Sequence, residues 1–190
     1  MPMKPFRSLS ALVLGLAPLA AGTPDFNPLM AVARETWPEK QHLAVVGNYD
    51  AIRQDVQALA AVAAPGSRIT VVDARTASSL PAALRILDQR KADFLVMMPR
   101  DPIFFEGGVQ GAKLVRGLAQ RGVPSVGTAA VALDQGAVFA IGARTGGQLL
   151  VTEKLQGTVS VILPSRAAAP AALASYTTPN GVRVEVAALP

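Results

Sequence analysis

Polar side chains that could bind a small molecule occur directly after short apolar runs of this sequence. Arg100 and Asp101 follow the apolar run 94–98 and stand between two prolines. In open α/β sheets, ligands lie just beyond the carboxyl ends of the strands. An amide, a ring, opposite charges and a hydroxyl could together orient a zwitterion or polar metabolite. The candidate ligand-binding residues are Asn48, Tyr49, Asp73, Arg75, Arg100, Asp101 and Thr128.

Each candidate also has a structural alternative. Asn48 and Asp50 fit a turn and a helix cap, in which Asp50 would accept free amides of the first helical turn. Asp73 could likewise be a capping residue. Arg100 and Asp101 could form a solvated ion pair, which would contribute little. The pattern leaves both roles open.

Catalysis is not expected, and no residue is assigned a catalytic role. His42 is the only histidine, and it lies at the start of the first apolar run, where we expect a partly exposed edge residue. Asp101 and Glu106 could face one pocket, but their separation is not fixed. Glycines 107, 108 and 111 match a dinucleotide fingerprint poorly. With no cysteine, we expect no structural metal and no cofactor.

The elements that would position these residues alternate between strands and helices. Apolar or β-branched runs predict strands at 42–47, 68–73, 92–98, 124–128, 136–142 and 158–163. Helical spacing predicts helices at 50–64, 79–91, 107–121 and 145–156, and a short helix at 29–36. Short connections predict parallel βαβ units. The expected fold is α/β: a three-layer α/β/α sandwich with a mostly parallel, Rossmann-like sheet.

The two ends of the sequence have different compositions from the middle. Lys4 and Arg7, an apolar stretch at 9–21 and an A-x-G site predict a signal peptide at 1–22, cleaved after Gly22. The alternative is an uncleaved membrane anchor. We expect a lead-in at 23–41, a binding lobe at 42–164 and a tail at 165–190. Candidate strands at 174–177 and 182–186 flank Pro179-Asn180-Gly181, which is typical of a hairpin.

Charge and cysteine content narrow the classes of partner and compartment. Cleavage after Gly22 would lower the net charge from +5 to +3, because it removes Lys4 and Arg7. The basic residues are scattered, so we expect no nucleic acid partner. An exported chain without cysteines fits a periplasmic location, with no stable membrane insertion after cleavage.

Three segments resemble a known family: SLPAALRIL before KADFLVMMPRDPIF, then RGVPSVGTAAVALDQGAVFAIG, then KLQGTVSVILP. From about 43 to 163 the order is similar to the carboxyl-terminal lobe of bacterial ABC transporter substrate-binding proteins of the tryptophan and tyrosine type. Pro99 and Asp101 match the proline and acidic residue after the family's third strand. The stretch 123–128 matches its pocket-lining segment, and Gly136 matches a glycine before a short strand.

The resemblance implies a periplasmic-binding-protein-type lobe that binds a small polar or aromatic metabolite for an ABC transporter permease. The family usually has two lobes that close on the ligand. A single lobe would offer half a site, which a second copy or another protein would complete. The alternative is a periplasmic protein-interaction module without a ligand, which would use the lobe face or an exposed edge of the 176–186 hairpin. A hydrolase or transferase on this scaffold is a weaker third reading.

Overall fold

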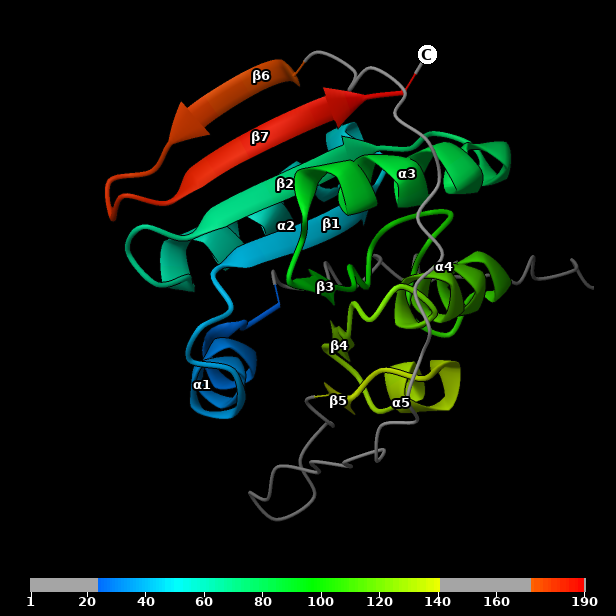
Figure 1. Cartoon of the computed structure of the whole chain (residues 1–190), viewed down its shortest axis with the longest axis horizontal. Coiled ribbons are helices and arrows are strands. Elements are labelled where there is room, and N and C mark those ends of the chain that lie inside the picture. Colours follow the sequence, from blue (N-terminus) through cyan, green and yellow to red (C-terminus); the bar gives the residue numbers. More distant parts are fainter. Residues whose placement is uncertain (1–23, 141–171, 190) are drawn as a thin grey trace, which may run out of the picture.

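The computed structural model describes residues 24–140 and 172–189, which form one seven-stranded sheet with helices (Figure 1). The strands are β1 His42–Gly47, β2 Arg68–Asp73, β3 Phe94–Val96, β4 Ser125–Gly127, β5 Phe139–Ala140, β6 Ala172–Thr177 and β7 Arg183–Ala188. The helices are α1 Asn27–Thr36, α2 Tyr49–Val62, α3 Leu80–Arg90, α4 Val109–Ala119 and α5 Val131–Gln135, with a 3₁₀ turn at Ala77–Ser79. The chain is therefore an α/β protein.

The sheet is parallel except at one edge. Its order is β5-β4-β3-β1-β2-β7-β6, and only β6 runs antiparallel to its neighbour. Chain order reverses around β1, because β2 pairs with one side of β1 and β3 with the other. Because β1 to β5 are parallel, their carboxyl ends lie along one edge of the sheet. The candidate residues lie at or just after these strand ends.

Apolar side chains cover both faces of the sheet, as period-2 alternation in the strands requires. Leu43 and Val45 of β1 pack in a cluster with α1 and α2, whereas Ala44 and Val46 pack in a second cluster with α3, α4 and α5. Strands β1 and β2 are buried on both faces, which explains their continuous apolar runs. None of the helices in the described ranges is both long and apolar enough to cross a membrane.

Most expected elements are confirmed within one or two residues. The strands at 42–47 and 68–73 have the expected bounds, and the hairpin around Pro179-Asn180-Gly181 is present. Of the strand expected at 136–142, residues 136–140 are described, and they contain the two-residue β5. Helix α5 was not expected, because five residues are too short to show a helical period. The expected elements at 1–22, 145–156 and 158–163 lie outside the described residues.

The carboxyl-terminal residues are part of the sheet. Strand β7 pairs in parallel with all six residues of β2, from Arg68 opposite Arg183 to Asp73 opposite Ala188. Its hairpin turn is fastened to α2, because Asn180 Nδ2 donates to the carbonyl oxygens of Ala60 and Ala63 at 3.0 and 3.3 Å. Ala60 lies in the last turn of α2 and Ala63 is its C-cap residue, and carbonyl oxygens at a helix end lack intrahelical donors. The hairpin therefore extends the sheet and caps a helix.

The expectation that His42 is a partly exposed edge residue is wrong. His42 belongs to β1 in the middle of the sheet and is 6% exposed. Its Nε2 lies 2.8 Å from Thr70 Oγ1 on β2, and its Nδ1 lies 3.0 Å from the Lys91 carbonyl oxygen and 2.8 Å from Arg68 Nη2. Burial, reinforced by the Arg68 charge, lowers the pKa of His42 below its usual value near 6.5.

Burial of His42 predicts that acid destabilises the fold through this group. Between the folded pKa and about 6.5, the unfolded chain binds a proton that the folded chain rejects, so stability falls as pH drops through this interval. Because the chain has one histidine, untagged protein gives a single set of imidazole signals in NMR. We expect a titration midpoint below 6.5 in the folded protein. A midpoint at or above that value would contradict the buried placement.

Candidate functional site

Three carboxylates join neighbouring strands at the carboxyl edge of the sheet. Asp73, the last residue of β2, accepts the Tyr49 amide N–H at 3.0 Å. Asp101, after β3, accepts the Asn48 amide N–H at 2.6 Å, and Glu106 accepts that of Thr128 at 2.5 Å. In sheet order, these bonds link β2 to β1, β1 to β3 and β3 to β4. We call Asp73, Asp101 and Glu106 the bridging carboxylates.

Asp101 occupies the position where chain order reverses, between β1 and β3. Its Oδ2 accepts the Asn48 amide, and its Oδ1 accepts the amides of Ile103 and Phe104 at 2.9 and 2.5 Å. The side chain is 2% exposed. A Cβ on Gly47 would overlap the Asp101 carboxylate, so the glycine makes room for it. In many open α/β sheets ligands lie at this reversal of strand order, but here both oxygens of Asp101 accept backbone amides.

Asp73, Tyr49 and Arg75 form a second group of contacts at this edge. Arg75 donates through Nε and Nη2 to Asp73 Oδ2, at 3.0 and 2.9 Å. Its Nη2 also lies 2.8 Å from Asp50 Oδ2. The helix cap is Asn48, whose Oδ1 accepts the Asp50 amide at 3.2 Å, so the expectation that Asp50 caps α2 is wrong. Asp50, in the first turn of α2, instead pairs with the exposed side chains of Arg53 and Arg75.

Arg100 is directed toward α2 and pairs with Asp55. Arg100 Nε donates to Asp55 Oδ2 at 3.0 Å, and its Nη2 contacts Oδ1 of the same carboxylate. Asp55 is fully buried and the Arg100 side chain is 30% exposed. The bidentate pairing raises the pKa of Arg100 and fastens the β3 loop to the helix. The expected solvated ion pair between Arg100 and Asp101 is therefore replaced by a bridge to Asp55.

Glu106 differs from the other bridging carboxylates because one of its oxygens has no partner among the described residues. Oε1 accepts both the Thr128 amide and the Thr128 hydroxyl, the latter at 3.0 Å. Oε2 is buried without a hydrogen bond. Burial raises the pKa of Glu106, against the lowering effect of the Thr128 and Ala129 amides. A buried acceptor of this kind is costly unless a donor reaches it.

Exposed apolar side chains surround the loop that carries Glu106. Phe105, Val109 and Val131 are 39%, 71% and 40% exposed, and they are the large exposed hydrophobic residues of the described chain. Two of them lie over glycines: a Cβ on Gly108 would touch the Phe105 ring, and one on Gly107 would touch Val131. Phe105 lies in the loop after β3, and Val109 and Val131 are the first residues of α4 and α5. We call these three residues the apolar rim.

The structure brings the seven predicted site residues to one edge but distributes them among separate contacts. Asn48 and Asp101 meet at β1 and β3, and Tyr49, Asp73 and Arg75 meet at β1 and β2. Thr128, which follows β4, contacts Glu106, and Arg100 pairs with Asp55 of α2. Their role in ligand binding stays a prediction. Sequence reasoning weighed Glu106 only as a catalytic carboxylate and missed the apolar rim. The pairing of Phe105 and Glu106 before two glycines was the available signal.

Other kinds of site find little support in the described ranges. No group of three or more His, Asp or Glu side chains there could hold a metal ion. An open hollow of about 390 Å³ lies between α2 and the turn that joins β6 to β7. It is lined by Gln57, Ala61, Thr178, Pro179 and Asn180. Asn180 already bonds the end of α2 there. The hollow therefore belongs to the junction between the hairpin and the helix.

Comparisons with known proteins assign no relative to this chain: no family model, curated protein or solved structure matches it.

The Asp101 contacts predict a structural penalty for an otherwise conservative change. In Asp101→Asn, one of the two oxygens becomes an amide donor and must face a backbone N–H, which loses its acceptor. We expect a loss of about 1–3 kcal/mol in the free energy of unfolding, measured by urea denaturation. Asp88→Asn is the matched control, because Asp88 makes only a 3.8 Å contact with exposed Lys91. Its change should stay within about 0.5 kcal/mol. Equal effects of the two variants would contradict the bridging role.

Proposed function

We propose that this chain is an exported, non-enzymatic lobe that binds a small metabolite at Glu106 and the apolar rim. The observation that carries the proposal is Oε2 of Glu106, which is buried with no hydrogen-bond partner among the described residues and follows the exposed Phe105 in the chain. A ligand that donates a hydrogen bond from an amino or hydroxyl group would satisfy this oxygen. Its apolar or aromatic part would rest on Phe105, Val109 and Val131. The ligand is thus a small polar or aromatic metabolite with at least one donor group.

Access to Glu106 depends on side chains that can move. Phe105 and Val131 are exposed, and each packs against a glycine that offers no side chain of its own. Rotation of these side chains would open a path to the carboxylate without disturbing β3 or β4. Thr128 holds the other oxygen, so the carboxylate stays oriented when a ligand binds. We assign Glu106 and Thr128 to the ligand site and the remaining predicted residues to the framework around it.

The wider setting of the proposal is a Rossmann-like, three-layer α/β/α lobe. Two arguments support this classification. The helices α1 and α2 pack in one apolar cluster, and α3, α4 and α5 pack in a second cluster on the other face of the sheet. The strand order β2-β1-β3-β4-β5 is that of a common doubly wound sheet. The family-like segments and the basic, then apolar, start of the sequence support periplasmic delivery to an ABC transporter permease. A second copy or another protein would complete the cleft.

A thermal-shift screen of protein purified from the periplasm, with an expected start at Thr23, tests this function. A ligand that binds only the folded state adds about 2.7 kcal/mol of stability at a hundred times its dissociation constant. We expect a hit among amino acids, nucleosides or organic acids that carry an amino or hydroxyl donor. Silence across the panel from folded protein would overturn the proposal.

Variants of a verified complex locate the site. Glu106→Gln keeps an oxygen for Thr128 but removes the charge, so affinity should fall at least about tenfold. Asp134→Asn is the matched control, because Asp134 is an exposed acidic residue on the neighbouring α5. Its affinity should equal that of the unmodified protein. If Glu106→Gln binds as well as the control, the site lies elsewhere.

A further inference from the structure

Strand β6 forms one edge of the sheet, and its outer side is unpaired within residues 24–140 and 172–189. It has six residues, and β7 lies on its inner side (Figure 1). At the opposite edge, the described residues of β5 are Phe139–Ala140. A long edge strand presents a row of free backbone groups to which another strand can bond. Strand β6 is the long edge strand of the described sheet.

The hydrogen-bond pattern identifies which groups of β6 face outward. Thr178 N–H donates to the Val182 carbonyl at 2.9 Å, so Thr178 and Val182 form a hydrogen-bonded pair. Such pairs alternate in an antiparallel ladder, which makes Tyr176 and Val184 the next bonded pair. Ser175 and Thr177 are then the residues whose N–H and C=O point away from β7.

A contact on the far side of β7 agrees with this pattern. Arg183 lies opposite Thr177, and its N–H donates to the Ser67 carbonyl at 3.0 Å, on the β2 side. Arg183 therefore gives no N–H bond to Thr177. Two donors and two acceptors of β6, one of each from Ser175 and Thr177, thus have no backbone partner among residues 24–140 and 172–189.

The composition of this edge lacks the usual protection against strand pairing. The sequence from Ala172 to Val182 contains no charged residue, and no proline interrupts β6. Charged side chains, proline and short length are the common means by which edge strands avoid pairing. The bulge between Ala172 and Ala174 affects only the beginning of the strand. Ser175 and Thr177 are exposed and small, so their side chains leave the edge accessible.

We propose that β6 pairs antiparallel with β6 of a second copy of this chain, so that two sheets become continuous across a two-fold axis. Ser175 and Thr177 each offer one donor and one acceptor, so the edge is complementary to its own two-fold copy. An uncharged edge meets no like-charge repulsion when it faces itself. A two-fold contact pairs the β6 edges of the two copies with each other. No β6 edge is then left to bind a third copy, so the assembly closes at a dimer.

This contact is independent of the proposed ligand site. β6 lies at one end of the sheet order, whereas Glu106 follows β3 and contacts the segment after β4. The dimer would therefore form with or without ligand, and it would not complete the cleft. It gives a specific surface to the protein-interaction alternative.

Light scattering on size-exclusion fractions across a dilution series tests the dimer. Ser175→Pro removes one outward N–H and places a ring at the contact, while the bonded pairs of β6 and β7 keep their donors. We expect the dissociation constant to rise at least about tenfold. Ser175→Ala is the matched control, because it keeps the N–H, and it should dimerise as the unmodified chain does. A monomeric unmodified chain, or a dimer that is equally tight in both variants, overturns the proposal.

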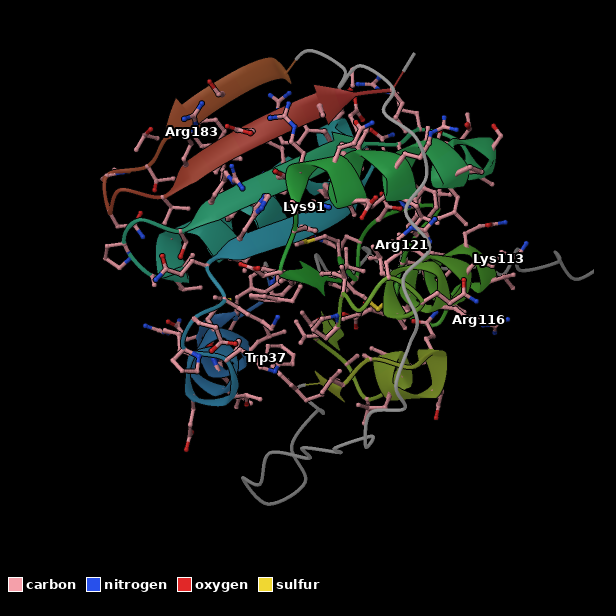
Figure 2. All side chains as sticks on the ribbon, in the orientation of Figure 1. Trp37, Lys91, Lys113, Arg116, Arg121 and Arg183 are labelled. Carbon is pink, nitrogen blue, oxygen red and sulfur yellow. The ribbon has the colours of Figure 1, made fainter. Side chains whose placement is uncertain are left out.

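A label measurement keeps the test valid if Ser175→Pro fails to fold. The chain has no cysteine, so a nitroxide on Ser175→Cys reports a single position. In the proposed dimer, Ser175 of each copy lies opposite Thr177 of the other, so the two labels are diagonal neighbours about 8 Å apart at the backbone, which gives strong dipolar coupling. Lys113→Cys on α4 is the control, since Figure 2 places Lys113 away from β6. Strong coupling at position 175 alone supports the proposal. A dimer without it, paired through another surface or a different segment, overturns it.

Discussion

Backbone amides at the carboxyl edge of the sheet depend on carboxylates from the neighbouring strands. A parallel sheet leaves its loops without ladder partners, and a buried amide without an acceptor is costly. Asp73, Asp101 and Glu106 supply these acceptors in sheet order from β2 to β4. Arg100 adds a link from the β3 loop to Asp55 on α2. The polar side chains at the carboxyl edge, where a ligand would be sought, thus hold neighbouring strands and loops together.

This constraint changes how the polar residues of the edge should be interpreted. Asp101 fills the space between β1 and β3, and Gly47 leaves room for it. Glu106 is the bridging carboxylate whose second oxygen accepts no hydrogen bond from the described residues, and Phe105 of the apolar rim precedes it in the chain. The proposed ligand site therefore lies between β3 and β4, one strand away from the junction of β1 and β3. The open side of β6 is a separate feature, because it arises where the ladder ends and not where the loops begin.

The sequence predicted the fold better than the contacts of the site. Continuous apolar runs identified β1 and β2 to the residue, since strands buried on both faces leave a clear pattern. The turn Pro179-Asn180-Gly181 predicted the hairpin, but not that β7 would pair with β2, because pairing of distant segments has no local signal. His42 was misplaced since its partners Thr70 and Lys91 lie far along the chain. The Arg100 bridge to Asp55 was hidden for the same reason.

Amide hydrogen exchange measured by NMR tests the central claim most directly. The amides of Asn48, Phe104 and Thr128 lie in loops, where exchange is usually fast. If the bridging carboxylates hold them, they should be protected nearly as well as amides within β1 and β2, and the amide of Gly66, in the exposed turn before β2, should not be. Exchange of all three at the rate of Gly66 would show that the carboxyl edge is not tied together by these bonds, and the account would fail.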